Sequence, residues 1–390
     1  MKRINGWRLR GKWLCVMLTA LMGVCLLFHC NAANAVLLPE EFIKYRIWID
    51  RPNSTLSMYI QSEGEYSYVM GQDKETLQHW LALIAGHGEI KWQVTNALPE
   101  YYCGATEING IAYILVSRMG IPIEERTPYL QPITRDGIKQ EPITLPSWVA
   151  DATMIKSSDS LLFFSRRPQP LTIAEYDQHM VPVWEKQVTV GENMINYFMN
   201  VVETDEGYAL LGPSRYGQDA VLSQLDWNGH HLWTKTYAGM GWVSATPASQ
   251  GRLILLCEQA DGQDAARRYS LLVLDSDDAT VDQHGLEIPE ESIELRGILM
   301  LSNGILACGA RQYGDKAPEI VLLFLDDAYQ VQFVADVPQL KDTISQISLT
   351  ENGMITLLGI GTGDNGQASG YVTGYTIDIE ALRLWLTTNE

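Results

Sequence analysis

Short apolar runs that end in turn residues recur along the chain with a period of about fifty residues. An apolar residue followed by aspartate closes such a run at Asp177, Asp226, Asp275, Asp326 and Asp378, with spacings of 49, 49, 51 and 52 residues. Seven residues after each aspartate stand Trp184, Trp233, Asp282, Phe333 and Trp385. A period of about 20 to 50 residues is typical of propellers and other repeat architectures, so this pattern indicates a fold built from repeated units.

A third mark of the repeat is a turn residue in front of an apolar run. Glycine has this place at Gly64, Gly110, Gly207, Gly251, Gly304 and Gly353, and Ser160 takes it once. These seven positions define seven units of about 48 residues from residue 54 to the C-terminus. Glycine suits such tight turns because it adopts positive φ without steric cost.

The unit around residue 215 shows the internal order of one repeat. Apolar and alternating segments at 197–203, 208–211, 220–225 and 231–236 read as four short strands separated by turns. A four-stranded unit at this spacing is typical of a propeller blade, which buries its two faces against its neighbours. We therefore predict an all-β fold, a seven-bladed β-propeller of four-stranded antiparallel blades over residues 54–390.

Residues 36–53 form an N-terminal extension in this reading. Its segment 42–50 is extended and apolar in character, and it either adds an outer strand to the last blade or lies across the base of the ring.

The recurring aspartate and aromatic residues have structural explanations. An aspartate carboxylate fixes a turn by accepting hydrogen bonds from nearby backbone N–H groups. The aromatic residue, in the fourth strand, is expected to pack between neighbouring blades.

The segment 225–239, with the sequence LDWNGHHLWTKTYAG, carries a family resemblance. It resembles the repeat of secreted bacterial β-propeller proteins described as quinoprotein-like or WD40-like, whose unit reads Leu-Asp-x-x-Gly-x-x-x-Trp followed by Tyr and Gly. The resemblance implies the fold. It assigns no functional residues. Quinoprotein docking units have one more residue between the Asp and the Gly and a Thr before that Gly, and this segment has neither.

The N-terminus has the pattern of a signal peptide. Five basic residues between Lys2 and Lys12 precede the apolar run 13–28, and Ala33 and Ala35 supply an A-x-A site, so we expect cleavage after Ala35 and a secreted or extracytoplasmic protein. The run has 16 residues, which is short for a membrane-spanning helix. An uncleaved membrane anchor remains the alternative.

The charge of the chain disfavours two classes of partner, and its cysteines bear on disulfide formation. The chain has 28 basic and 47 acidic side chains and a net charge of −19, which disfavours nucleic acid and anionic membranes as partners. Cys103, Cys257 and Cys308 follow the signal segment, and an odd number is a poor disulfide framework. Cys257 and Cys308 lie in apolar runs and are expected to be buried thiols, with a bridge between them left open.

No catalytic motif stands out in the chain. We find no G-x-S-x-G, H-E-x-x-H, C-x-x-C or G-x-G-x-x-G sequence, and we predict neither a metal nor a cofactor. The adjacent His230 and His231 read as turn residues, since neighbours on a strand point to opposite faces. A candidate ligand site combines Arg215, Tyr216, Trp242, Arg311 and Tyr313, because arginines and aromatics on one propeller face can hold sugars or acidic groups.

Two functions of different classes follow. The first is a secreted, monomeric, non-enzymatic binding or scaffold propeller for an unknown protein or glycan. The second is a secreted hydrolase or lyase that acts on a polysaccharide or peptide in the central pocket. The fold alone does not choose between them.

Overall fold

The computed structural model of the chain describes most of the strands and the turns between them. The described residues are 35–37, 42–49, 54–61, 66–85, 89–118, 120–157, 160–165, 170–190, 200–213, 219–248, 251–259, 268–275, 281–288, 292–302, 304–311, 319–337, 342–349, 354–361, 371–378, 381–382 and 384.

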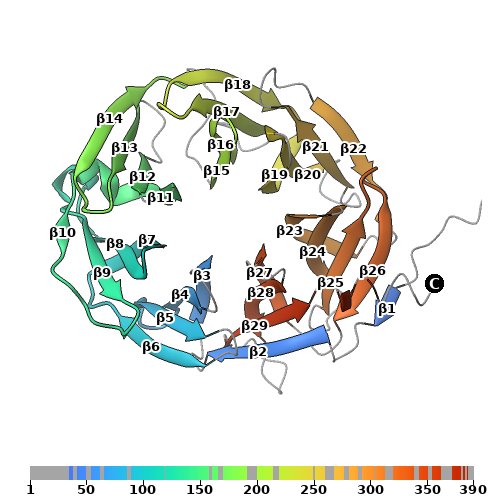
Figure 1. Cartoon of the computed structure of the whole chain (residues 1–390), viewed down its shortest axis with the longest axis horizontal. Coiled ribbons are helices and arrows are strands. Elements are labelled where there is room, and N and C mark those ends of the chain that lie inside the picture. The colour runs from blue at the N-terminus through green and yellow to red at the C-terminus, as the bar shows by residue number, and fades with distance from the viewer. Residues whose placement is uncertain are drawn as a thin grey trace, which may run out of the picture.

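The sheets are arranged around a common axis, so the all-β propeller is confirmed (Figure 1). Blades one to five each consist of four consecutive strands. Blade one has β3 (Ser54–Gln61), β4 (Tyr66–Asp73), β5 (His79–Ala85) and β6 (Ile90–Thr95), and blade two has β7 (Glu100–Ile108), β8 (Ile111–Arg118), β9 (Tyr129–Thr134) and β10 (Ile143–Thr144). Blade three has β11 (Ala152–Ser157), β12 (Ser160–Ser165), β13 (Leu171–Tyr176) and β14 (Pro182–Val188), and blade four has β15 (Asn200–Thr204), β16 (Gly207–Pro213), β17 (Ala220–Asp226) and β18 (His231–Tyr237). Blade five has β19 (Met240–Pro247), β20 (Leu253–Gln259), β21 (Arg268–Leu274) and β22 (Val281–Leu286).

Two further sheets include strands from the N-terminal segment. The mixed sheet has β23 (Ile293–Leu301), β24 (Gly304–Arg311), β25 (Glu319–Leu325) and β26 (Val331–Val337), to which β1 (Ala35–Leu37) is added. The closing blade has β27 (Asp342–Leu349), β28 (Met354–Gly361) and β29 (Tyr371–Asp378), with β2 (Ile43–Ile49) as its fourth strand.

The prediction of seven four-stranded antiparallel blades is wrong. Among the described residues six blades have that composition, whereas the mixed sheet has five strands. Its fifth strand, β1, runs parallel to β26, with Ala35 opposite Val334 and Leu37 opposite Asp336. The repeat missed this because β1 lies outside the periodic region and pairs with a strand about 300 residues further along the chain.

The segment 42–50 provides the outer strand of the closing blade. Strand β2 pairs antiparallel with β29, with Ile43 opposite Ile377 and Ile49 opposite Val372. This is the first of the two placements considered from the sequence. It joins the two ends of the chain in one sheet, which closes the ring without a covalent bond.

Burial differs between the inner and outer strands of a blade. The second strands are buried almost throughout, as in β16 and β24, because other blades cover both of their faces. The outermost strand β18 is only partly buried and has exposed residues along its length. Hydrophobic clusters therefore lie between successive blades, as between blade three and blade four, where Phe164, Leu210 and Val221 meet.

The recurring aspartates fix the turn between the third and fourth strands, as predicted. Asp177 Oδ1 accepts hydrogen bonds from the backbone N–H groups of His179 (2.9 Å) and Val181 (2.8 Å). The same pattern recurs at Asp226 and at Asp326.

Two turn glycines, Gly207 and Gly304, are required for a second reason besides φ. Gly304 has φ +130°, and a Cβ at this position would lie 2.2 Å from the carbonyl oxygen of Leu325 on the next strand. The hairpin therefore leaves no room for a side chain. At the equivalent place in blade three, Ser160 bonds back to the carbonyl of Ser157.

The aromatic mark also has its predicted place. Trp184 packs against the cluster between blades three and four, and Trp233 against the cluster between blades four and five. Trp385 lies outside the described residues.

A β-bulge recurs in the innermost strands and was not predicted. In five of them the fourth residue has no partner on the second strand, and these residues are Ser57, Cys103, Val243, Arg296 and Ser345. Bulges locally bend a strand and increase its twist, and they often lie beside functional sites.

Candidate functional site

The ring has two unlike faces. The loops between second and third strands and the connections between blades open on one face, here called the upper face. The tight turns between first and second strands and between third and fourth strands lie on the other, the lower face.

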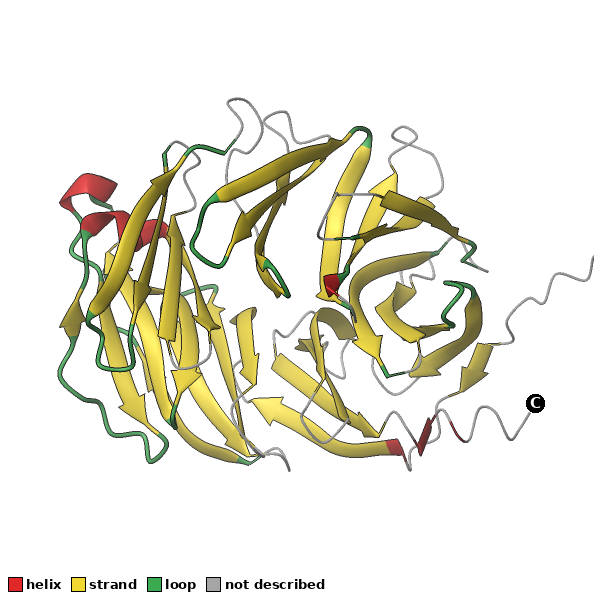
Figure 2. Ribbon diagram, turned by 45° about the horizontal axis from the view of Figure 1, so that its top comes forward, coloured by secondary structure: helices red, strands yellow, loops and turns green. Residues whose placement is uncertain are grey.

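Blade two departs most from the regular blade, and it does so on the upper face. Its outer strand β10 has only two residues, and two short 3-10 helices, η2 (Ile123–Glu125) and η3 (Ser147–Asp151), interrupt its loops. These helices lie together at one edge of the ring (Figure 2). In repeat proteins, insertions into single repeats often gather on the binding face.

Tyrosines and arginines cluster on the upper face beside these helices. Arg126 Nη1 donates to the hydroxyl of Tyr101 (2.8 Å), and its Cζ lies 5.9 Å from the Tyr101 ring centroid. Tyr129 donates its hydroxyl proton to Glu100 Oε2 (3.0 Å). Arg118, whose side chain is 55% exposed, lies 4.0 Å from the other oxygen of Glu100. We call Glu100, Tyr101, Arg118, Arg126 and Tyr129 the upper tyrosine cluster.

His79 joins blade one to this cluster. Its ring lies 6.1 Å from the ring of Tyr101 and 6.2 Å from that of Tyr102, and Asn96 Oδ1 accepts its backbone N–H (2.7 Å). The side chain is buried, and Nδ1 has no hydrogen-bond partner among the described residues. Burial lowers the pKa of His79 below its ordinary value, so the imidazole is neutral at neutral pH.

The tyrosines of the cluster keep their protons at neutral pH. Burial raises the pKa of Tyr129 to about 12, and the hydrogen bond to Glu100 adds to this effect. Burial also raises the pKa of Tyr101. The hydroxyls are therefore hydrogen-bond donors and the rings are apolar surfaces, while neither tyrosine has the lowered pKa that a general base needs.

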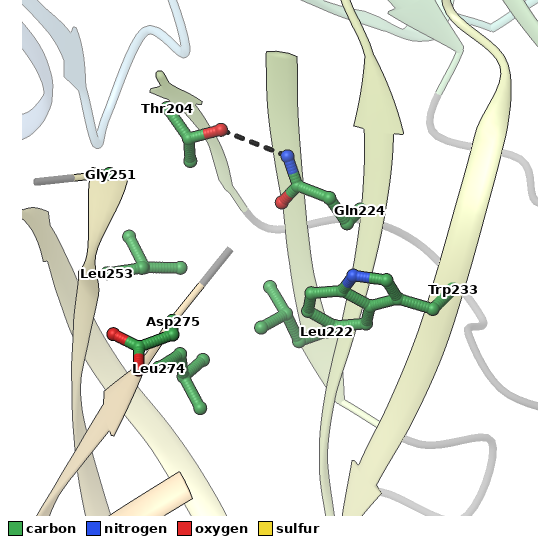
Figure 3. A pocket seen from close by; sticks show the side chains of 8 residues that line it. All are labelled: Thr204, Leu222, Gln224, Trp233, Gly251, Leu253, Leu274 and Asp275. Atoms are coloured by element: carbon green, nitrogen blue, oxygen red, sulfur yellow. Dashed lines mark hydrogen bonds between the residues drawn. The ribbon is translucent and has the colours of Figure 1, made fainter. Parts of the chain in front are cut away.

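The lower face has a small pocket between blades four and five (Figure 3). Its enclosed volume is about 10 Å³, which is room for roughly one water molecule. Its lining residues are Thr204, Leu222, Gln224, Trp233, Gly251, Leu253, Leu274 and Asp275. This volume is below the ~300–1,000 Å³ of typical small-molecule pockets.

Two of the ligand-site residues predicted from the sequence, Trp242 and Arg311, lie among the described residues, and the site as a whole stays a prediction. Trp242 packs against the cluster between blades four and five, and its indole N–H has no hydrogen-bond partner among the described residues. Arg311 is buried at the end of β24 and pairs with Asp336. Arg215, Tyr216 and Tyr313 lie outside the described residues, as does the proposed signal segment up to residue 34.

The described residues hold no group of three or more His, Cys, Asp or Glu side chains arranged to bind a metal. Cys103, Cys257 and Cys308 are free thiols, so the bridge left open from the sequence is not formed. Burial raises the pKa of the Cys257 and Cys308 thiols to about 12, which makes them unreactive as nucleophiles. Within the described part of the chain, no helix has the length and apolarity needed to span a bilayer.

Comparison with known proteins identifies the fold alone. No protein-family model and no curated protein sequence matches the chain. Among solved structures, the Dos1 propeller is similar with a TM-score of 0.55 and 9% identity, covering 86% of this chain and 95% of that one. A prolyl endopeptidase gives a TM-score of 0.51 and 11% identity over 82% of this chain, but only 46% of its own. A protein of unknown function from Bacteroides caccae gives 0.41 and 16%, covering 73% and 94% of the two chains.

Sequence reasoning missed the upper tyrosine cluster and Arg296. The repeat is weak over residues 96–151, where Tyr101 and Tyr102 follow one another. This loss of periodicity is the feature of the sequence that points to the cluster. Arg296 is the bulged residue of β23 and pairs with Glu294 (2.5 Å). No pattern in the sequence indicates a bulge there.

Proposed function

We propose that this protein is an exported, non-enzymatic binding propeller whose recognition surface is the upper face of blade two. The single observation that carries the proposal is the upper tyrosine cluster beside η2 and η3, where blade two departs from the regular four-stranded repeat. Tyrosine and arginine are enriched in binding surfaces, because they combine large contact area with hydrogen-bonding groups.

The partner class is a glycan or a protein surface that offers acceptors and flat apolar patches. Tyr101 contributes a ring and a protonated hydroxyl, Tyr129 contributes a ring whose hydroxyl is bonded to Glu100, and the exposed Arg118 offers a cation at the edge of the cluster. Such groups hold sugars by ring stacking and hydroxyl hydrogen bonds, and they hold protein surfaces in the same way.

The test is an array of bacterial and host glycans and of peptides, probed with the purified protein and with an Arg118→Ala/Tyr101→Ala variant. We expect at least one glycan or peptide to bind the unaltered protein and to lose at least tenfold in affinity with the variant. Asp327→Ala, an exposed substitution on the lower face of the mixed sheet, is the matched control and should bind normally. Binding that the double variant retains in full would remove the proposal.

The enzyme alternative is tested in the same experiment. Each bound glycan or peptide is incubated with the protein and analysed by mass spectrometry. If the protein cleaves a bound molecule and the upper-face variant does not, the enzyme alternative would replace the binding function as our conclusion.

A further inference from the structure

Trp227 is an exposed aromatic side chain on the lower face, in the turn between β17 and β18 of blade four. The residue is 44% exposed, and among the residues whose exposure is described no other Phe, Tyr or Trp is exposed. The residue after the recurring aspartate is polar in three of the other four units, where Gln178, Ser276 and Asp327 stand. Trp227 therefore departs from the repeat at a position where a solvated side chain suffices for the turn.

The indole of Trp227 is held in one orientation. Its Nε1 donates to the backbone carbonyl of Asp205 (3.1 Å), and its ring centroid lies 5.2 Å from that of Tyr208, with the two planes at 78°. Tyr208 is 3% exposed, and its own ring lies 5.4 Å from that of Phe164. Because the indole is already fixed by these contacts, it loses little side-chain entropy when another group packs on it.

The surroundings of Trp227 are acidic. Glu203, Asp205 and Glu206 belong to the hairpin whose turn accepts the indole N–H, and the first two are exposed. Lys186 brings one positive charge to this region, where its Nζ donates to the backbone carbonyl of the residue after Trp227 (2.5 Å). Three carboxylates in one hairpin, on a chain with a net charge of −19, favour the approach of a cation and disfavour that of an anion.

A contact between a cation and an indole already exists in the neighbouring blade. Lys186 Nζ lies 5.6 Å from the ring centroid of Trp184 in blade three. A cation within about 6 Å of an aromatic ring is attracted to its π electrons, and tryptophan attracts it most strongly. Arginine suits an exposed indole better than lysine does, because its planar guanidinium group stacks on the ring while its N–H groups reach carboxylates.

We propose that Trp227 is a docking surface for an arginine side chain that projects from a basic segment of a partner protein. The guanidinium group stacks on the exposed part of the indole, and its N–H groups donate to the carboxylates of Glu203 and Asp205. The contact needs no cavity, because the exposed ring itself is the binding surface. The site lies on the face opposite the upper tyrosine cluster and does not depend on it.

The experiment compares two peptides that differ only in charge. The probe is the acetylated amide of Gly-Arg-Gly-Arg-Gly, and its counterpart has citrulline, whose neutral urea group is almost the same size as guanidinium, in place of each arginine. Proton NMR follows the side-chain Hδ signals of the peptide, which the ring current of a stacked indole moves upfield. We expect the arginine peptide to bind with millimolar affinity and the citrulline peptide to bind at least fivefold more weakly.

Three variants and salt test the parts of the site. Trp227→Leu keeps an apolar contact with Tyr208 but removes the indole, so it should abolish the upfield shift and weaken binding at least fivefold. Glu203→Gln/Asp205→Asn should weaken binding at least twofold, and so should 1 M NaCl, at which the Debye length is about 3 Å. Asp327→Asn, at the position of the mixed sheet equivalent to Trp227, is the matched control and should bind normally.

Equal binding of the citrulline peptide, or full affinity in Trp227→Leu, would overturn the proposal. An equal loss in Asp327→Asn and in the double variant would also overturn it, because binding would then follow the overall charge of the protein. The substituted positions are exposed, and circular dichroism and the urea midpoint check that each variant is folded.

Discussion

The lower and upper faces of this propeller follow opposite rules. On the lower face the same devices recur from blade to blade, namely an aspartate that holds one turn and a glycine or serine that closes another. On the upper face blade two has helices, a shortened outer strand and the tyrosine cluster. The comparison teaches that residues which repeat in this chain make the ring, whereas the residues that interrupt the repeat are the candidates for recognition.

This comparison gives a general expectation for mutations. Substitutions at repeated positions of the lower face should lower the free energy of unfolding and leave upper-face binding unchanged. Substitutions in the upper tyrosine cluster should lower binding with little change in stability.

The largest effect is expected at a turn glycine. Gly304→Ala places a Cβ 2.2 Å from the Leu325 carbonyl oxygen, so the two strands must move apart, and we expect a loss of more than about 3 kcal/mol in urea unfolding. Two control substitutions separate the steric clash of the new Cβ from the cost of a positive φ. Gly239→Ala, with φ +71° and open space, should cost about 1 kcal/mol, and Gly285→Ala, which has open space and no positive φ, should cost less. Equal losses at all three glycines would contradict the explanation.

The next effect is expected at a turn aspartate. Asp326→Ala removes the acceptor of two backbone N–H groups, of Ala328 and Gln330, each at 2.9 Å. Hydrogen bonds to a charged group contribute about 1.5–3 kcal/mol, and partial exposure reduces this to a loss of about 1–2 kcal/mol. The neighbouring Asp327→Ala should be within about 0.5 kcal/mol of the unaltered protein. Thermal and urea unfolding measure both, and a neutral Asp326→Ala would argue against the turn as a structural device.

A pH-dependent effect is expected on the upper face. The pKa of His79 is lowered by burial in the folded protein, so the unfolded chain takes up a proton at higher pH than the folded chain. Stability from this group is complete above its ordinary pKa of 6.5 and falls as the pH drops below that value. His79→Gln should therefore show a shallower loss of melting temperature between pH 7 and pH 5. The exposed His179→Gln is the control, and the idea fails if its pH profile matches that of His79→Gln.

The smallest effect is a gain in stability on the upper face. Leu77 is 51% exposed and has φ +58°, a conformation that costs a non-glycine residue about 1 kcal/mol. Leu77→Gly should therefore raise the free energy of unfolding by about 0.5 kcal/mol after the entropy of glycine is subtracted. Leu232→Gly, at an exposed position within β18, should instead lower it. A loss at both positions would show that contacts of Leu77 outweigh its backbone strain.

The sequence by itself determined the blade and the role of its marks. Local period-two strands, turn chemistry at Asp177 and Asp226, and the close approach at Gly304 depend on residues near one another in the chain or in one hairpin. Such local rules recur in each unit, so they can be read without knowing how the units meet.

Only the tertiary structure decided which residues from different units meet. It added β1 to the mixed sheet, placed β2 beside β29 and paired the buried Arg311 with Asp336. It also brought His79 of blade one to Tyr101 of blade two, and Gln224 of blade four to Asp275 of blade five. These contacts depend on the stacking of whole blades and on the exit direction of loops, which no periodic pattern encodes.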